Sequence, residues 1–105
     1  MTEANSSALA GDFSQAMIDL VKGIATALVD NPDSVSVVAL EDRDGTLLRL
    51  RVAQTDVGKV IGKQGRTARS LRTILSAASM KLKHRYSLDI VEESDAAEPS
   101  EPLKL

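Results

Sequence analysis

The sequence contains no cysteine and no tryptophan, and its aromatic side chains are one phenylalanine and one tyrosine. Without cysteine the chain cannot form disulfides, thiol nucleophiles or cysteine-based metal sites. With Phe13 and Tyr86 alone, it also lacks the aromatic platform on which RRM and cold-shock domains stack bases. The single histidine, His84, has no cysteine or serine partner in a recognisable catalytic motif, so we interpret it as a solvated residue at a helix end. No nucleophile–base pair or metal-ligand set is recognisable, which argues against an enzyme and predicts no cofactor.

Long hydrophobic runs are also absent. The longest apolar stretches are far too short to span a membrane. Residues 1–11 lack both the basic start and the apolar run of a signal peptide, so we expect a cytoplasmic protein. A chain of 105 residues with 43% apolar and 27% charged residues is typical of one globular domain with a modest core.

Acidic residues are missing from one long segment, residues 57–88. Of the 13 lysines and arginines, eight lie in this segment, and the other five share the rest of the chain with all 15 acidic residues. The eight are Lys59, Lys63, Arg66, Arg69, Arg72, Lys81, Lys83 and Arg85. Such a local charge beside an acidic remainder is typical of a binding face for a polyanion. The simpler alternative is a helix rich in cations for solubility, but such helices usually interleave glutamate with lysine.

The chain is predicted to form one domain, residues 12–93, between two loose ends. Residues 1–11 are small and polar, and residues 94–105 are acidic and contain Pro99 and Pro102. Both ends are therefore expected to be disordered.

The domain is predicted to open with a helix that begins at Asp12. Asp12 can serve as N-cap, and Gln15 follows three residues later. Apolar residues then recur at spacings of three and four, which gives the helix one hydrophobic face. They are Phe13, Met17, Leu20, Val21, Ile24 and Leu28. Pro32 prevents the helix from continuing.

A β-hairpin is predicted next. Residues 35–40 are β-branched and indicate a strand. Residues 41–45 end in glycine and have the length of a hairpin turn, and residues 46–52 alternate as a second strand. The predicted buried side of that strand comprises Leu48, Leu50 and Val52.

Two helices and a third strand complete the predicted domain. Thr55 or Asp56 is expected to cap a short helix that runs through Ile61. A longer helix is predicted from about Arg66 to Lys83, and residues 86–91 alternate as a strand. The order α-β-β-α-α-β predicts an α+β fold, in which three helices cover one face of a three-stranded mixed sheet. The last strand should lie parallel to the second.

The two helices are separated by Gly62-Lys63-Gln64-Gly65. Glycine lets the backbone turn sharply and approach a ligand closely. A helix that starts at such a turn directs free N–H groups and the positive end of its dipole towards it, which favours phosphate. Lys63 and Arg66 add cationic donors, so the segment predicts a clamp for a phosphate backbone. The alternative is a helix–helix turn with a glycine C-cap, for which one glycine would suffice.

Two other ligand sites are not supported by the spacing. A nucleotide-binding P-loop needs four residues between its glycines, followed by lysine and a hydroxyl residue. Here three residues separate Gly58 from Gly62, and glutamine follows Lys63. Asp42 and Asp44 resemble part of a calcium loop, but the remaining ligand spacing is missing, which favours a plain acidic hairpin tip.

The element order and the GxxG motif together resemble a type II KH domain, whose GXXG loop holds a short single-stranded nucleic acid. The similarity extends to the KhpA family of small bacterial single-KH RNA-binding proteins. The segments that carry it are Leu28-Val29-Asp30-Asn31-Pro32, Arg51-Val52-Ala53, Gly58–Arg66 and Leu88-Asp89-Ile90-Val91. The resemblance covers about residues 13–93 and leaves out both ends of the chain.

This resemblance implies non-catalytic binding of short single-stranded RNA. Lys63 and Gln64 would face the sugar-phosphate backbone, whereas Val60 and Ile61 would help to floor an aliphatic groove under the bases or belong to the core. The complete predicted RNA-binding set is Lys59, Val60, Ile61, Gly62, Lys63, Gln64, Gly65, Arg66 and Arg69. Each of the outer cations, Lys59, Arg66 and Arg69, could equally be an ordinary solvated charge.

The resemblance further implies a homodimer or a complex with a larger KH-containing protein. It also implies a role as an RNA chaperone or post-transcriptional regulator linked to the cell envelope and cell shape. The alternative hypothesis is a KH-fold module for protein–protein interaction or dimerisation, with incidental RNA binding. The acid-free basic segment distinguishes the two hypotheses, because a docking module would not need it.

Overall fold

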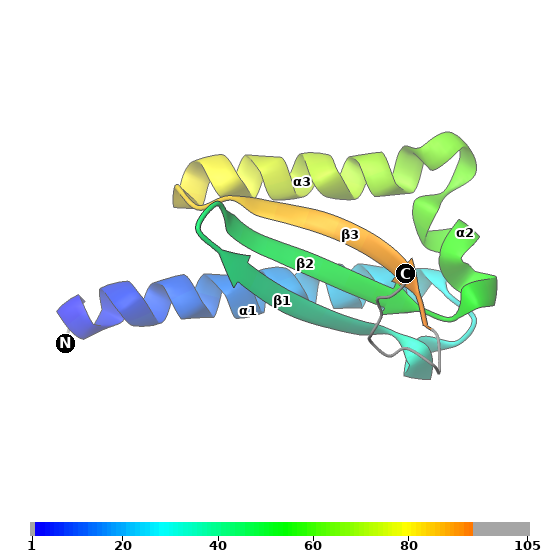
Figure 1. Cartoon of the computed structure of the whole chain (residues 1–105), viewed down its shortest axis with the longest axis horizontal. Coiled ribbons are helices and arrows are strands. Elements are labelled where there is room, and N and C mark those ends of the chain that lie inside the picture. The colour runs from blue at the N-terminus through cyan, green and yellow to red at the C-terminus, as the bar shows by residue number, and fades with distance from the viewer. Residues whose placement is uncertain (1, 94–105) are drawn as a thin grey trace, which may run out of the picture.

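The computed structural model describes the backbone of residues 2–93 and the side chains of residues 13–93. The helices are α1 (Thr2–Leu28), α2 (Val57–Ile61) and α3 (Arg66–Leu82), and the strands are β1 (Ser36–Asp42), β2 (Gly45–Val52) and β3 (Tyr86–Glu92). Short 3-10 turns join some of them. The described helices cover one face of the sheet (Figure 1), so the predicted α+β order and layering are confirmed.

The sheet has the order β1-β2-β3. β1 pairs with β2 antiparallel, and β2 pairs with β3 parallel, as predicted. The hairpin turn is shorter than the predicted five residues, because only Arg43 and Asp44 lie between the strands. The Asp42 carboxylate closes this turn by accepting the N–H of Asp44 at 2.8 Å and that of Gly45 at 3.2 Å.

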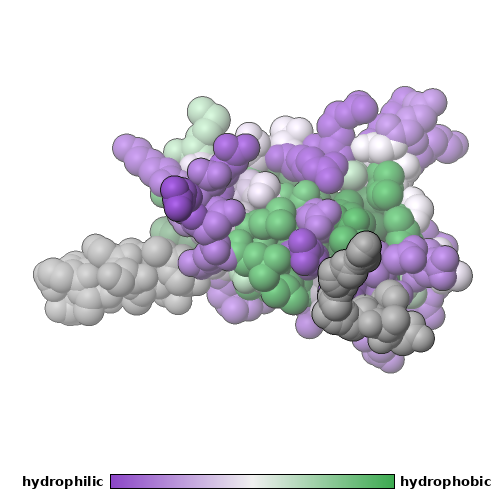
Figure 2. Space-filling view, viewed as in Figure 1, coloured by the Kyte–Doolittle hydropathy of each residue, from purple (hydrophilic) through white to green (hydrophobic). Residues whose placement is uncertain are grey.

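The face of the sheet opposite the helices is turned to the viewer in Figure 1. Because side chains alternate along a strand, Val38 and Leu40 of β1 share this face with Leu47 of β2. Val38 and Leu40 are exposed, and hydrophobic side chains gather at the centre of this view (Figure 2).

α1 begins at Thr2, so the predicted start at Asp12 is wrong. Residues 2–11, for which the sequence predicts a disordered extension, have a helical backbone. The physical reason is that this segment is rich in alanine, and a glycine inside a helix costs only about 1 kcal/mol relative to alanine. The predicted acidic tail, residues 94–105, lies outside the described residues. Among the described helices, none combines the length and apolar character that a membrane span requires.

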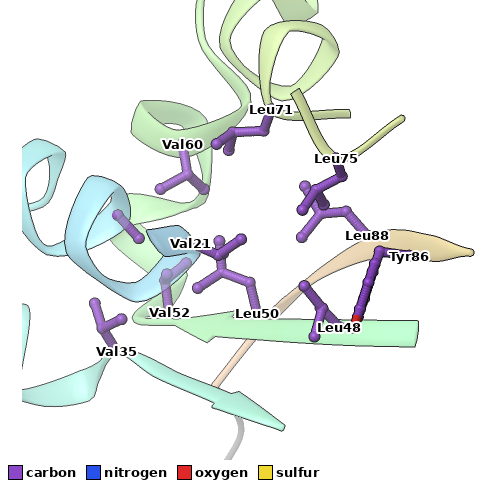
Figure 3. Packing of buried hydrophobic residues seen from close by; sticks show 11 residues of the cluster. Val21, Val35, Leu48, Leu50, Val52, Val60, Leu71, Leu75, Tyr86 and Leu88 are labelled. Carbon is purple, nitrogen blue, oxygen red and sulfur yellow. The ribbon is translucent and has the colours of Figure 1, made fainter. Parts of the chain in front are cut away.

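The core lies between the sheet and the helices. Leu48, Leu50 and Val52 of β2 are fully buried, which confirms the predicted inward face of this strand. Side chains from the three helices meet them and Leu88 of β3 (Figure 3). These helical residues are Val21 and Ala25 of α1, Val60 of α2, and Leu71 and Leu75 of α3. Burying each large side chain contributes about 1.5–3 kcal/mol, so this cluster fixes where α2 and α3 sit on the sheet.

Asp56 ties the start of α2 to the end of α1. The structure shows no side-chain cap on α2 from this residue, so its predicted capping role is wrong. Its buried carboxylate instead accepts the backbone N–H groups of Asp30 at 3.2 Å and Asn31 at 2.9 Å, and the Asn31 side-chain amide at 3.0 Å. Burial raises the pKa of the Asp56 carboxyl. These hydrogen bonds and the Lys59 ammonium outweigh burial and hold that pKa below its ordinary value.

Candidate nucleic-acid interface

The four residues from Gly62 to Gly65 form a tight bend between α2 and α3. Gly62 has φ +81° and ψ 168°, and Gly65 is left-handed with φ +73°. Gln64 is also left-handed, with φ 57° and ψ 27°, a conformation that costs a non-glycine residue about 1–2 kcal/mol. The bend thus depends on both glycines and not on a single glycine cap.

The two glycines are required for different reasons. A Cβ added at Gly62 would lie 2.3 Å from the Thr67 hydroxyl oxygen and 2.9 Å from the Thr67 backbone nitrogen. Gly62 therefore allows the first turn of α3 to pack against the bend. A Cβ at Gly65 would meet nothing within 4 Å. The missing side chain of Gly65 leaves open space on the surface, where a ligand backbone could approach.

Only part of the bend offers free main-chain donors, contrary to our expectation. The Gly62 N–H donates to the Gly58 carbonyl at 2.8 Å, and the Gly65 N–H donates to the Gly62 carbonyl at 3.0 Å. The Arg66 N–H donates to the Lys63 carbonyl. No turn or cap hydrogen bond is donated by the N–H groups of Lys63 and Gln64 within residues 2–93. Both side chains are exposed, so these two residues are the part of the bend that can bind an anion.

A groove of about 510 Å³ runs from this bend along the edge of the sheet. Its lining residues are Ile61, Gly65, Ala68, Arg69, Arg72, Asp89 and Ile90. They come from α2, the bend, α3 and β3. Figure 2 shows hydrophilic side chains over α3 and the α2–α3 bend, with hydrophobic side chains on the sheet beside them. The groove therefore combines an apolar floor with a cationic side formed by α3.

The structure separates the predicted site residues into two groups. Ile61, Gly65 and Arg69 line the groove, and Lys63, Gln64 and Arg66 are exposed at its end. Gly62 shapes the bend. Val60 and Lys59 do not join them.

Val60 belongs to the core, where it is fully buried, so of its two predicted places the core is confirmed and the groove floor is wrong. Neighbouring residues of a helix point about 100° apart, which is why Val60 faces the sheet while Ile61 is 36% exposed. Lys59 points towards the end of α1, where its ammonium lies 3.4 Å from Asp30 and 3.6 Å from Asp56. These ion pairs give it a structural partner, so it is not among the free cations of the groove.

Four groove residues were missing from the predicted set: Ala68, Arg72, Asp89 and Ile90. Arg72 follows Arg69 by three residues and so shares its helix face, a signal that the sequence did contain. Its guanidinium donates to the Leu88 carbonyl at 3.4 Å. Asp89 and Ile90 could be placed in the groove only once the edge position of β3 was known. The Asp89 carboxylate lies 3.2 Å from Arg49, which partly offsets its charge.

Comparison with known proteins assigns the chain to a family. A family model for the KH domain of KhpA and KhpB matches residues 18–90. This chain belongs to the KhpA/KhpB KH-domain family. The RNA-binding protein KhpA of Caldanaerobacter subterraneus subsp. tengcongensis is 49% identical over 75 residues, which is 71% of this chain and 100% of that protein. The KhpA of Halalkalibacterium halodurans is 50% identical over 76 residues, with 72% and 100% covered. The KhpA of Bacillus subtilis is 42% identical over 78 residues, with 74% and 96% covered.

Among solved structures, part of Era is similar to this KhpA-family chain. Aquifex aeolicus Era bound to GDP and AlF4⁻ matches with a TM-score of 0.49 and 16% identity, over 73% of this chain and 30% of the Era chain. Era in complex with MgGDPNP and nucleotides 1506–1542 of 16S ribosomal RNA matches with a TM-score of 0.48 and 15% identity. That match covers 72% of this chain and 29% of the Era chain.

Proposed function

We propose that this KhpA-family protein binds a few nucleotides of single-stranded RNA without catalysing a reaction. The observation that carries the proposal is the groove beside the bend, in which Ile61 and Ile90 provide apolar surface next to the exposed cations of α3. The curated relatives at 41–50% identity are named RNA-binding proteins, which supports the same assignment.

The phosphates are proposed to bind at the bend. The N–H groups of Lys63 and Gln64, which donate no turn or cap hydrogen bond, can donate to phosphate oxygens, and the ammonium of Lys63 and the guanidinium of Arg66 add charge. Gly65 leaves the space through which the strand passes from the bend into the groove. The clamp therefore uses two backbone donors and nearby side chains, and not the N–H groups of the glycines.

The bases are proposed to lie on the apolar surface of the groove. An aliphatic floor contacts the face of any base, so it supplies little discrimination and less affinity than an aromatic platform. Arg69 and Arg72 can donate to base or phosphate oxygens, and Asp89 can accept from an exocyclic amine. We expect modest affinity and a loose sequence preference, which titrations with tetranucleotides of different sequence can measure.

The cellular role is proposed from the family alone. We infer a bacterial cytoplasmic RNA chaperone or post-transcriptional regulator linked to the cell envelope and cell shape, acting as a homodimer or with a larger KH-containing protein. A second candidate is a protein-interaction module, which the exposed Val38 and Leu40 on the open face of the sheet favour. The two functions use different surfaces, so variants of the bend and of β1 can separate them.

The decisive test is the double variant Lys63→Asp with Gln64→Asp. It places two carboxylates where the phosphates are proposed to bind, and both side chains are exposed, so the fold should be retained. Aspartate also tolerates the left-handed backbone at Gln64. We expect RNA binding to be lost in a fluorescence anisotropy titration, while the melting temperature changes by only a few degrees.

A matched control is Arg43→Asp, which replaces an exposed cation by a carboxylate, as Lys63→Asp does, but at the hairpin tip, far along the chain from the bend. It should retain RNA binding. If the double variant binds RNA as tightly as the wild type does, the bend is not the RNA site.

A further inference from the structure

The cations of the basic segment extend beyond the reach of the bend. Lys81, Lys83 and Arg85 lie at the opposite end of α3, a helix of 17 residues. At a rise of 1.5 Å per residue, such a helix is about 25 Å long. A clamp at Lys63 and Gln64 does not account for exposed cations at that distance.

A second hollow, of about 290 Å³, lies at this far end between α3 and β3. Its lining residues are Arg72, Leu75, Ser76, Ser79, Arg85, Tyr86, Ser87 and Leu88. No acidic residue is among them. The hydroxyls of Ser76 and Ser87 have no partner within the described side chains, whereas that of Ser79 bonds to Leu75 and Tyr86. The hollow therefore offers the guanidinium of Arg85 in addition to that of Arg72, hydroxyl donors and an apolar floor.

Arg72 stands between the two hollows and belongs to both linings. Its side chain is largely exposed and reaches across to the Leu88 carbonyl on the outer edge of β3, at 3.4 Å. A hydrogen bond of that length is weak. The Arg72 guanidinium can therefore exchange its hydrogen bond to the Leu88 carbonyl for one to a bound anion at little cost in free energy. An anionic chain bound to Arg72 in this way could then extend through both hollows.

We propose that the second hollow is a subsite for the nucleotides that continue the strand held at the bend. The RNA footprint then runs along the whole α3–β3 edge to Arg85 and exceeds the four nucleotides that a GXXG loop clamps. This inference rests on the proposed function. Asp42 and Asp44 share the next depression with Arg85, so their repulsion of phosphate sets the far end of the path.

The test compares two RNA lengths on the full chain by fluorescence anisotropy: a tetranucleotide and an oligouridylate of about ten nucleotides. The longer RNA can bind in several registers, which by itself raises its affinity by less than about tenfold. The wild type should bind the longer RNA well over tenfold more tightly than the tetranucleotide. The variant Arg85→Ala should weaken binding of the longer RNA about tenfold and leave the tetranucleotide unchanged. For the longer RNA, the variant should also make the slope of the logarithm of the binding constant against the logarithm of salt concentration shallower by about 0.7.

Arg43→Ala is the matched control, because it removes an exposed arginine that lines neither hollow. It should leave both affinities unchanged. If Arg85→Ala weakens binding of both RNAs equally, Arg85 acts by general electrostatic attraction and the subsite is overturned. The subsite is also overturned if the wild type binds the longer RNA no more tightly than its extra registers explain. If neither RNA binds the wild type, the proposed function itself fails. The Arg85 main-chain carbonyl, which accepts the Thr46 N–H, is retained in the variant, so it should fold.

Discussion

At the scale of single residues, we expect the two glycines of the bend to affect stability and RNA binding differently. Gly62 is held against Thr67 in a backbone conformation that is nearly exclusive to glycine. The variant Gly62→Ala should lose about 2 kcal/mol of unfolding free energy or more, since the strain and the clash with Thr67 add. Thermal denaturation should show this as a fall of roughly 8 °C or more in melting temperature.

Gly65→Ala is the matched variant. It also places alanine at positive φ, but the new methyl group meets nothing within 4 Å. The expected loss of stability is about 1 kcal/mol, while RNA affinity falls because the methyl group occupies the open space beside the groove. Equal loss of stability in the two variants, with RNA binding retained in Gly65→Ala, would contradict this division of roles.

Residue-scale predictions from sequence succeeded where the environment is local. The alternation that placed Leu48 and Leu50 inside depends only on the pleat of one strand. Val60 and Ile61 are harder, because both are aliphatic neighbours and only the packing of a short helix decides which one enters the core. Lys59 is harder still, since its partners Asp30 and Asp56 come from two different segments.

At the scale of elements, the buried Asp56 carboxylate joins α1 to α2, and this contact gives a prediction of pH dependence. The pKa of Asp56 is lower in the fold than its ordinary value of about 3.9. A carboxyl group whose pKa is lowered by folding stabilises the fold at pH values above its ordinary pKa. This stabilisation is lost as the pH falls through the pKa of the group in the folded protein. We therefore expect Asp56→Asn to lower the melting temperature at pH 7 by several degrees, and the difference from the wild type to shrink below about pH 4.

Asp33→Asn is the control for this measurement, because Asp33 is an exposed carboxylate on the neighbouring 3-10 turn. Its melting temperature should follow that of the wild type at every pH. A difference between Asp56→Asn and the wild type that is the same at pH 3 and pH 7 would mean that the carboxylate charge has no part in the link.

Elements were predictable in their order but not in all their ends. The hairpin and the parallel third strand followed from patterning and the handedness of crossovers. The start of α1 did not, because the helix already includes the alanine-rich residues 2–11, which precede the predicted N-cap at Asp12. The groove required the edge position of β3, which brings Ile90 beside Ile61 although 28 residues separate them in the sequence.

At the scale of the whole molecule, we expect the distribution of charge and not its sum to govern RNA binding. The formal net charge is −2, so attraction of a polyanion depends on the cations gathered along α3 and the bend. The exposed cations of this edge closest to the groove are Lys63, Arg66, Arg69 and Arg72. Each phosphate that they neutralise releases counterions, which makes binding weaker as salt rises.

This distribution predicts the salt dependence of affinity. If all four cations neutralise phosphates, the logarithm of the binding constant should fall with the logarithm of salt concentration with a slope of about −3, at about −0.7 per phosphate. Replacing Lys63 alone by alanine should reduce the slope by about 0.7. The melting temperature of the free protein over the same salt range serves as the control for folding. A slope near zero would mean that the bases supply the affinity and that the cationic edge does not contact the RNA backbone.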